Sequence, residues 1–166
     1  MTKSTTGAAR RERVTIERTY GDVSLEEVWD MWTTKDGIES WWGPDGFAVT
    51  VRTLDPRPGG TLEYAMTAVE PAQIQFLAKA GMPVTHSVRA TYTEVTPPRR
   101  LAFTQIADFV PGVEPYEVAT TVELHAAAQG VRLVLTIDRM HDAHWTEMAV
   151  KGWESELGKL AKVLAA

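Results

Sequence analysis

Residues 142–166, at the C-terminal end of the sequence, constrain the fold more than any other stretch. Apolar side chains recur there at steps of three and four residues: Trp145, Met148, Ala149, Trp153, Leu157, Leu160, Ala161 and Leu164. This spacing predicts one amphipathic helix, and Asp142 is its expected N-cap. At 1.5 Å per residue the helix reaches roughly 35 Å. A helix that buries such a face needs a sheet to pack against.

The apolar face of this helix is uneven. Trp145 and Met148 are bulky, whereas Gly152, which follows them, has no side chain. This profile predicts a gap between the N-terminal half of the helix and the sheet, and small ligands bind in such spaces.

The rest of the chain consists mostly of stretches in which apolar and polar residues alternate, as they do in β-strands. We expect strands over 13–20, 47–53, 61–69, 84–95, 101–108, 116–126 and 131–138. Two short helices interrupt them. The first begins after Ser24, which forms a capping box with Glu27, and the second begins near Asp36 and ends at Trp41. The predicted fold class is α+β, with a curved antiparallel sheet of about seven strands wrapped around the C-terminal helix.

Three features allow alternative interpretations. Arg18 shares a face with Val14 and Ile16, so it either forms an ion pair at the rim of the sheet or contacts a ligand. Trp41 and Trp42 are adjacent and cannot both point the same way on a helix, so one is expected in the core and the other at a cavity or in solvent, although core packing is favoured for each taken singly. Residues 70–83 have a helical composition, and this insertion is either a lid over a cavity or an excursion at the sheet edge.

The overall composition limits the classes of protein to which this chain can belong. A chain of 166 residues is long enough for one domain, and we expect a flexible tail over 1–12 and a single domain over 13–166. The absence of cysteine excludes disulfides and thiol catalysis and indicates the cytoplasm. A net charge of −5 argues against a nucleic-acid partner, and no apolar run is long enough to span a membrane. The chain is expected to be a monomer or a homodimer.

Several local runs match the pattern of a known family: Arg18-Thr19-Tyr20, Glu27-Val28-Trp29, Trp41-Trp42-Gly43-Pro44-Asp45-Gly46-Phe47, the turn 55–60, the hairpin 92–104, and Gly152-Trp153 with Leu157 and Leu160. With the order of the elements, they resemble the START-like, helix-grip superfamily (SRPBCC). Within it, the chain is similar to single-domain bacterial members of the family named for the activator of the heat-shock-protein-90 ATPase. The resemblance implies a helix-grip fold. The superfamily includes lipid and hormone carriers, polyketide cyclases and co-chaperone domains, so function depends on the site.

The residues favour non-enzymatic binding of a small hydrophobic or amphipathic molecule between the sheet and the C-terminal helix. Aromatic and methionine side chains on inner faces are the expected lining of this cavity. The lining residues are Trp42, Phe47, Tyr64, Met66, Phe76, Met82, His86, Tyr92, Phe103, Phe109, Trp145 and Met148. Arg18, His86 and Gln105 are the candidate polar contacts.

Two other functions follow from the resemblance. One is a chaperone-associated module in the stress response, with a chaperone as its partner. The other is an enzyme like the polyketide cyclases and dehydratases, with His86 as a general base. No nucleophile elbow, phosphate loop or matched acid and base pair is present, so we assign no catalytic residue. His141 and His144 have no third ligand, so we expect neither a metal nor a cofactor.

Overall fold

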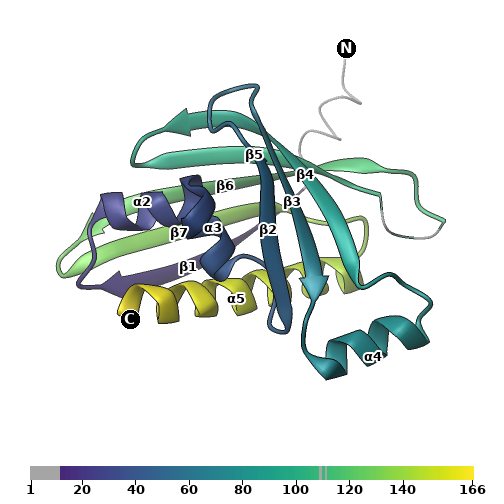
Figure 1. Cartoon of the computed structure of the whole chain (residues 1–166). Coiled ribbons are helices and arrows are strands. Elements are labelled where there is room, and N and C mark those ends of the chain that lie inside the picture. The colour runs from purple at the N-terminus through teal and green to yellow at the C-terminus, as the bar shows by residue number, and fades with distance from the viewer. Residues whose placement is uncertain (1–11, 109, 111) are drawn as a thin grey trace, which may run out of the picture.

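A computed structural model describes residues 12–108, 110 and 112–166, which form a seven-stranded antiparallel sheet and four helices (Figure 1). The order of the strands across the sheet is β1-β7-β6-β5-β4-β3-β2. The elements are β1 (Arg13–Gly21), α2 (Leu25–Thr33), α3 (Lys35–Trp41), β2 (Phe47–Leu54), β3 (Thr61–Ala68), α4 (Pro71–Lys79), β4 (Thr85–Thr96), β5 (Arg100–Ala107), β6 (Tyr116–Ala127), β7 (Gly130–Asp138) and α5 (Ala143–Ala165). The predicted fold class is therefore confirmed. Residues 1–11 of the predicted tail, and the predicted cavity residue Phe109, lie outside the described residues.

Helix α5 runs along the open side of the curved sheet, as the apolar spacing predicts (Figure 1). The Asp142 side chain accepts a hydrogen bond from the Trp145 amide, which confirms the predicted N-cap. Leu157 and Leu160 are fully buried, whereas Met148 is 51% exposed and Ala161 is also exposed. The predicted apolar face was too wide, because these two residues project from opposite flanks of the helix. Thr146 takes the buried position at the N-terminal end.

Helices α2 and α3 cover one end of the space between the sheet and α5, beside the C-terminal half of α5 (Figure 1). The capping box is present: Glu27 N donates to Ser24 Oγ at 3.1 Å, and Ser24 N donates to Glu27 Oε1 at 2.8 Å. The two helices approach closely at Gly37, where a Cβ atom would lie 2.4 Å from the Asp30 carbonyl oxygen. Only glycine fits at this crossing.

Trp41 and Trp42 are both buried, with 0% and 3% exposure. The core packing favoured for each of them is confirmed. The expectation that the two side chains diverge was wrong, because α3 ends at Trp41. Trp42 is its C-cap and has an extended backbone, with φ −66° and ψ 155°. Helical spacing therefore does not separate the two side chains, and both turn inward.

A β-bulge between Tyr92 and Glu94 reverses the alternation of side chains in β4. His86, Val88, Ala90 and Tyr92 follow the predicted inner face, and Tyr92 pairs with Phe103. Glu94, which strict alternation also places inside, pairs instead with Ala102 and binds Arg100. The bulge adds one residue to the strand and thereby turns Glu94 away from the inner face.

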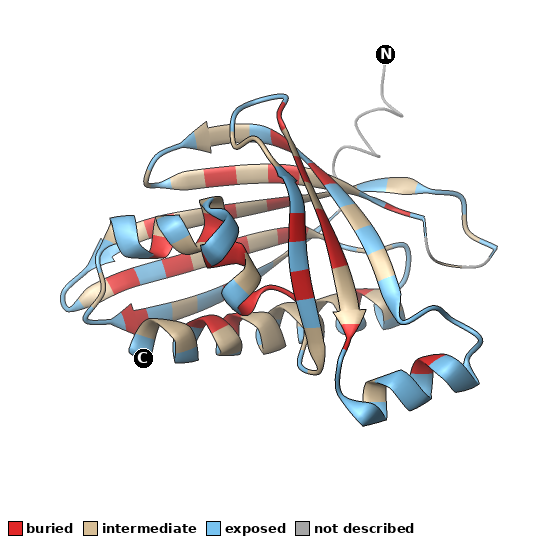
Figure 2. Cartoon of the chain, in the orientation of Figure 1, coloured by how far each residue is buried: buried red, intermediate tan, exposed pale blue. Residues whose placement is uncertain are grey.

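The inserted segment forms α4, which lies beyond the ends of β3 and β4 (Figure 1). Figure 2 shows that most of α4 is exposed. Leu77 is its buried residue and packs on the β3 side, whereas Phe76 is 65% exposed. The helix predicted within 70–83 is thus confirmed.

Candidate functional site: a carboxylate beside α5

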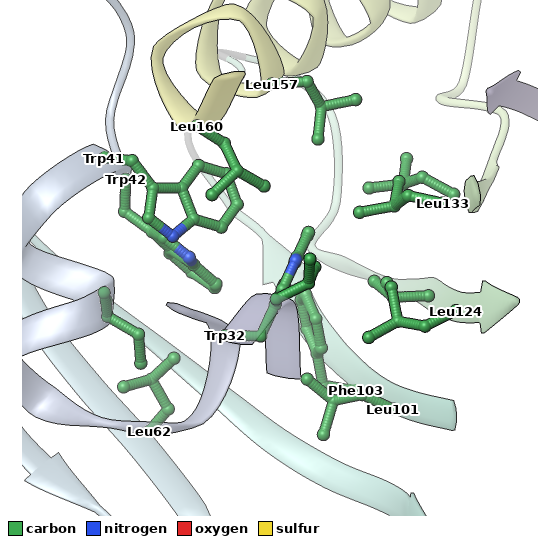
Figure 3. Close-up of a cluster of buried hydrophobic side chains, with 14 of the residues drawn as sticks. Trp32, Trp41, Trp42, Leu62, Leu101, Phe103, Leu124, Leu133, Leu157 and Leu160 are labelled. Atoms are coloured by element: carbon green, nitrogen blue, oxygen red, sulfur yellow. The ribbon is translucent and has the colours of Figure 1, made fainter. Parts of the chain in front are cut away.

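The interior between the sheet and the C-terminal half of α5 is filled by side chains. Trp32 contacts Trp41 edge-on at a centroid distance of 4.7 Å and stacks on Trp153 at 5.9 Å. Figure 3 shows Trp32, Trp41, Trp42 and Phe103 converging with leucines from the strands and from α5. Such packing leaves no room for a ligand between the sheet and the C-terminal half of α5.

The residues predicted to line a cavity fall into three groups. Four are buried within the aromatic core: Trp42, Tyr64, Tyr92 and Phe103. Five are half-buried: Phe47, Met66, His86, Gln105 and Trp145. The inward orientation expected for Phe76, Met82 and Met148 was wrong, because their side chains are exposed on α4, after α4 and on the flank of α5, respectively.

Arg18 lies at the rim of the sheet. Its Nη2 atom is 3.7 Å from Glu154 Oε2 on α5, and both side chains are substantially exposed. Arg18 therefore lies where the first alternative placed it, in an ion pair at the rim of the sheet. A contact of this kind stabilises a fold little, by about 0–1 kcal/mol.

His86 faces inward from β4, opposite Met66 on β3. Its Nδ1 atom is buried and has no hydrogen-bond partner among the described residues. Tyr92 Oη and Trp42 Nε1 are in the same situation. Buried polar atoms in proteins are usually satisfied, so these three atoms are exceptions among the described residues.

A hollow opens beside the N-terminal half of α5, at the end that α2 and α3 leave uncovered. Met140, Trp145, Met148 and Ala149 line it, and its volume is about 190 Å³. Gly152 lies one turn further along the same flank of the helix. A Cβ atom on Gly152 would meet no described atom within 4 Å. The hollow lies on this flank of α5, and a gap between the helix and the sheet at Gly152 stays a prediction.

Another hollow, of about 520 Å³, lies on the opposite flank of α5. It is lined by Val14, Arg139, Ala143, His144, Thr146, Glu147 and Val150. None of the predicted cavity residues borders it.

Glu156 lies one turn beyond Gly152 and binds the loop between α3 and β2. Gly43 N donates to Glu156 Oε1 at 3.1 Å. Lys159 Nζ donates to the carbonyl oxygens of Gly43 and Trp42, at 2.8 and 3.5 Å. Two side chains of α5 thus bind the Gly43 backbone: Glu156 accepts from its amide, and Lys159 donates to its carbonyl oxygen.

The surroundings of Glu156 disfavour its charge. Burial raises the pKa of Glu156 to about 7, although the Gly43 amide and the positive charge of Lys159 oppose the shift. The pKa of Tyr64 is also raised, first by burial and then by the negative charge of Glu156, while a hydrogen bond with Gln105 lowers it. Tyr64, Gln105 and Glu156 therefore form one polar group within an apolar region. We call Glu156, Trp42, Tyr64, Gln105 and Trp153 the Glu156 site.

Sequence reasoning found Trp42, Tyr64 and Gln105 but missed Glu156. A signal was available, since Gly152, Glu156 and Lys159 follow one another at helical steps on the flank of the apolar face. The contact with Gly43 was not available, because it joins residues 113 positions apart.

His141 and His144 have separate surroundings at the start of α5. His141 Nδ1 lies 2.8 Å from Tyr116 Oη, and its Nε2 lies 3.4 Å from Asp142 Oδ2. His144 contacts the ring of Trp145 edge-on at 5.8 Å. These contacts fix the turn between β7 and α5.

The sequence of residues 22–165 matches the family described as Activator of Hsp90 ATPase homolog 1-like protein. The chain belongs to this family. No functionally curated protein matches the chain. Among the described residues, no helix is both long and apolar enough to cross a membrane.

Solved structures of bacterial proteins share the fold. The AHSA1 protein of Silicibacter pomeroyi superposes with a TM-score of 0.72 at 23% identity, over 93% of this chain and 98% of that chain. A protein of Chromobacterium violaceum superposes with a TM-score of 0.72 at 22% identity, over 92% of this chain and 96% of that chain. A protein of Arthrobacter aurescens superposes with a TM-score of 0.73 at 22% identity, over 92% of this chain and 86% of that chain. These similarities support the helix-grip fold of this family member.

Proposed function

We propose that this protein binds a small hydrophobic or amphipathic molecule along α5, in the hollow that Met140, Trp145, Met148 and Ala149 line. The observation that carries this proposal is the apolar hollow beside the N-terminal half of α5. Gly152 lies one turn further along the helix, and a Cβ atom added there would meet no described atom within 4 Å. Apolar side chains line the hollow, and its open side leaves a polar head in contact with solvent. This arrangement suits a molecule that has an apolar body and a polar head.

The size of the hollow limits how such a molecule binds. Its volume of about 190 Å³ is below the roughly 300 Å³ of pockets that enclose a whole small molecule. The hollow therefore holds one end of the ligand, and the rest extends past Gly152. Met140 and Met148 are flexible and adapt to an irregular apolar surface.

Filling the space at Gly152 tests the proposal. We expect Gly152→Leu to fold, because an added Cβ atom meets no described atom within 4 Å and leucine favours helices. It should weaken the binding of a neutral apolar dye such as Nile red at least about tenfold. Native mass spectrometry of freshly purified protein should also show less co-purified small molecule.

Gly158→Leu is the matched control. Gly158 lies in the same helix and is exposed, and a Cβ atom added to it would also meet no described atom within 4 Å. Its substitution should leave Nile red binding unchanged. Equal dye binding by both variants and the unmodified protein would place the binding surface elsewhere.

A chaperone-associated role is the second candidate, and the exposed apolar residues in and around α4 favour it. They are Val69, Ile74, Phe76, Met82 and Val84. Exposed patches of this kind often contact other proteins. On this hypothesis, Phe76→Ser lowers the recovery of the host's heat-shock-protein-90 homologue in a pull-down, whereas Gly152→Leu does not. Unchanged recovery with Phe76→Ser would remove α4 from this role.

A further inference from the structure

Two methionines and a tryptophan line the hollow beside the N-terminal half of α5. Trp145, Met148 and Ala149 share one flank of the helix, and Met140 comes from the turn between β7 and α5. The described residues that line this hollow carry no charge. They therefore select a ligand by the shape and polarizability of its apolar end and not by an ion pair.

Contacts outside the hollow hold its methionine and tryptophan walls in place. Met140 Sδ lies 3.8 Å from Tyr116 Oη, which also accepts a hydrogen bond from the His141 amide at 3.0 Å. The rings of Tyr116 and His141 meet edge-on at 5.7 Å, and His141 lies 6.3 Å from Trp145 at an angle of 34°. The turn thus presents a thioether and an aromatic ring in one fixed arrangement, and such preorganisation lowers the entropic cost of binding.

The size of the hollow matches one six-membered ring. Its volume is about 190 Å³. A dry apolar cavity of roughly 150 Å³ binds benzene. A methionine sulfur about 5 Å from an aromatic ring makes a favourable contact that a saturated group does not reproduce, and each such contact raises affinity by roughly two- to tenfold. An indole ring adds a stacked or edge-on pair with a second aromatic ring.

We propose that the end of the ligand bound in this hollow is an aromatic ring, in contact with Met140, Trp145 and Met148. The rest of the molecule, with its polar head, lies outside the hollow. This inference rests on the proposed function and adds the chemical class of the group that enters the site. A hollow that acted through hydrophobicity alone would favour a saturated ring, which has more apolar surface than an aromatic ring with the same number of carbons.

Phenylhexanol and cyclohexylhexanol test the inference, because they share a chain and a hydroxyl group and differ only in the terminal ring. Isothermal titration calorimetry of the unmodified protein should show that phenylhexanol binds at least about threefold more tightly. Hydrophobicity alone predicts the opposite order. If cyclohexylhexanol binds as tightly or more tightly, the inference fails while the proposed function stands. If neither alcohol binds, both fail.

Met148→Leu removes one sulfur and keeps an apolar side chain of similar volume on the helix. The Met148 side chain is 51% exposed, so we expect this variant to fold. Its affinity for phenylhexanol should fall at least about twofold, whereas its affinity for cyclohexylhexanol should not change. An undiminished preference for phenylhexanol would overturn the assignment of the ring to this hollow.

Met82→Leu is the matched control. Met82 is exposed after α4 and is not among the described residues that line the hollow. This variant should keep the full preference for phenylhexanol. An equal loss of preference in Met82→Leu and Met148→Leu would also contradict the assignment.

Discussion

Replacing Trp41 with alanine should lower the free energy of unfolding by about 4 kcal/mol. The Trp41 side chain is fully buried, and its ring contacts both Trp32 and Trp42. Its Nε1 atom also donates to the Met31 carbonyl at 2.8 Å, so truncation removes a hydrogen bond as well as filled volume. Urea unfolding followed by far-ultraviolet circular dichroism measures the change without depending on tryptophan emission.

Phe76→Ala is the control for aromatic truncation. Phe76 is 65% exposed on α4, and its replacement should change the free energy of unfolding by no more than about 0.5 kcal/mol. Similar losses for the two variants would contradict the packing described around α3.

Glu156→Gln should make the protein more stable above neutral pH, by about 3 kcal/mol near pH 8. The ordinary pKa of the group is 4.5, and burial raises it to about 7 in the folded protein. The folded state therefore binds this proton more tightly than the unfolded chain. The destabilisation from ionising Glu156 is absent below 4.5, grows as pH rises, and is complete above about 7.

The glutamine side chain of this variant carries no charge and still offers an oxygen to the Gly43 amide. The variant and the unmodified protein should thus have the same free energy of unfolding near pH 4, and the difference should appear between about pH 5 and about pH 8. Urea unfolding at a series of pH values gives this curve. A difference that does not depend on pH, or a variant that is less stable near pH 8, would show that the carboxylate is not held in an apolar environment.

Glu154→Gln provides the comparison. Glu154 is exposed, and its contact with Arg18 spans 3.7 Å. Its removal should change stability by less than about 1 kcal/mol. Glu154 and Glu156 lie two positions apart on one helix, so the difference between the stability changes of the two variants isolates the effect of burial.

The candidate site was predictable in part. Trp42, Tyr64 and Gln105 were visible because alternation in strands and apolar spacing identify inward side chains. The bare position at Gly152 predicted a gap between the helix and the sheet, whereas the hollow of the structure lies on the flank of α5. Phe76 was misplaced, and Met148 lines the hollow from the flank of α5 rather than from its buried face. Apolar character alone does not distinguish the centre of a helix face from its flank.

Local patterns determined the sheet, the capping box at Ser24, the N-cap at Asp142 and the long final helix, because these depend on neighbours within a few positions of the chain. Tertiary structure decided the rest. It turned both Trp41 and Trp42 inward, moved Glu94 to the outer face through a bulge, and placed Glu156 against Gly43. The charge of a carboxylate and the packing of a ring depend on groups that are far away in sequence and close in space, and only folding brings these groups together.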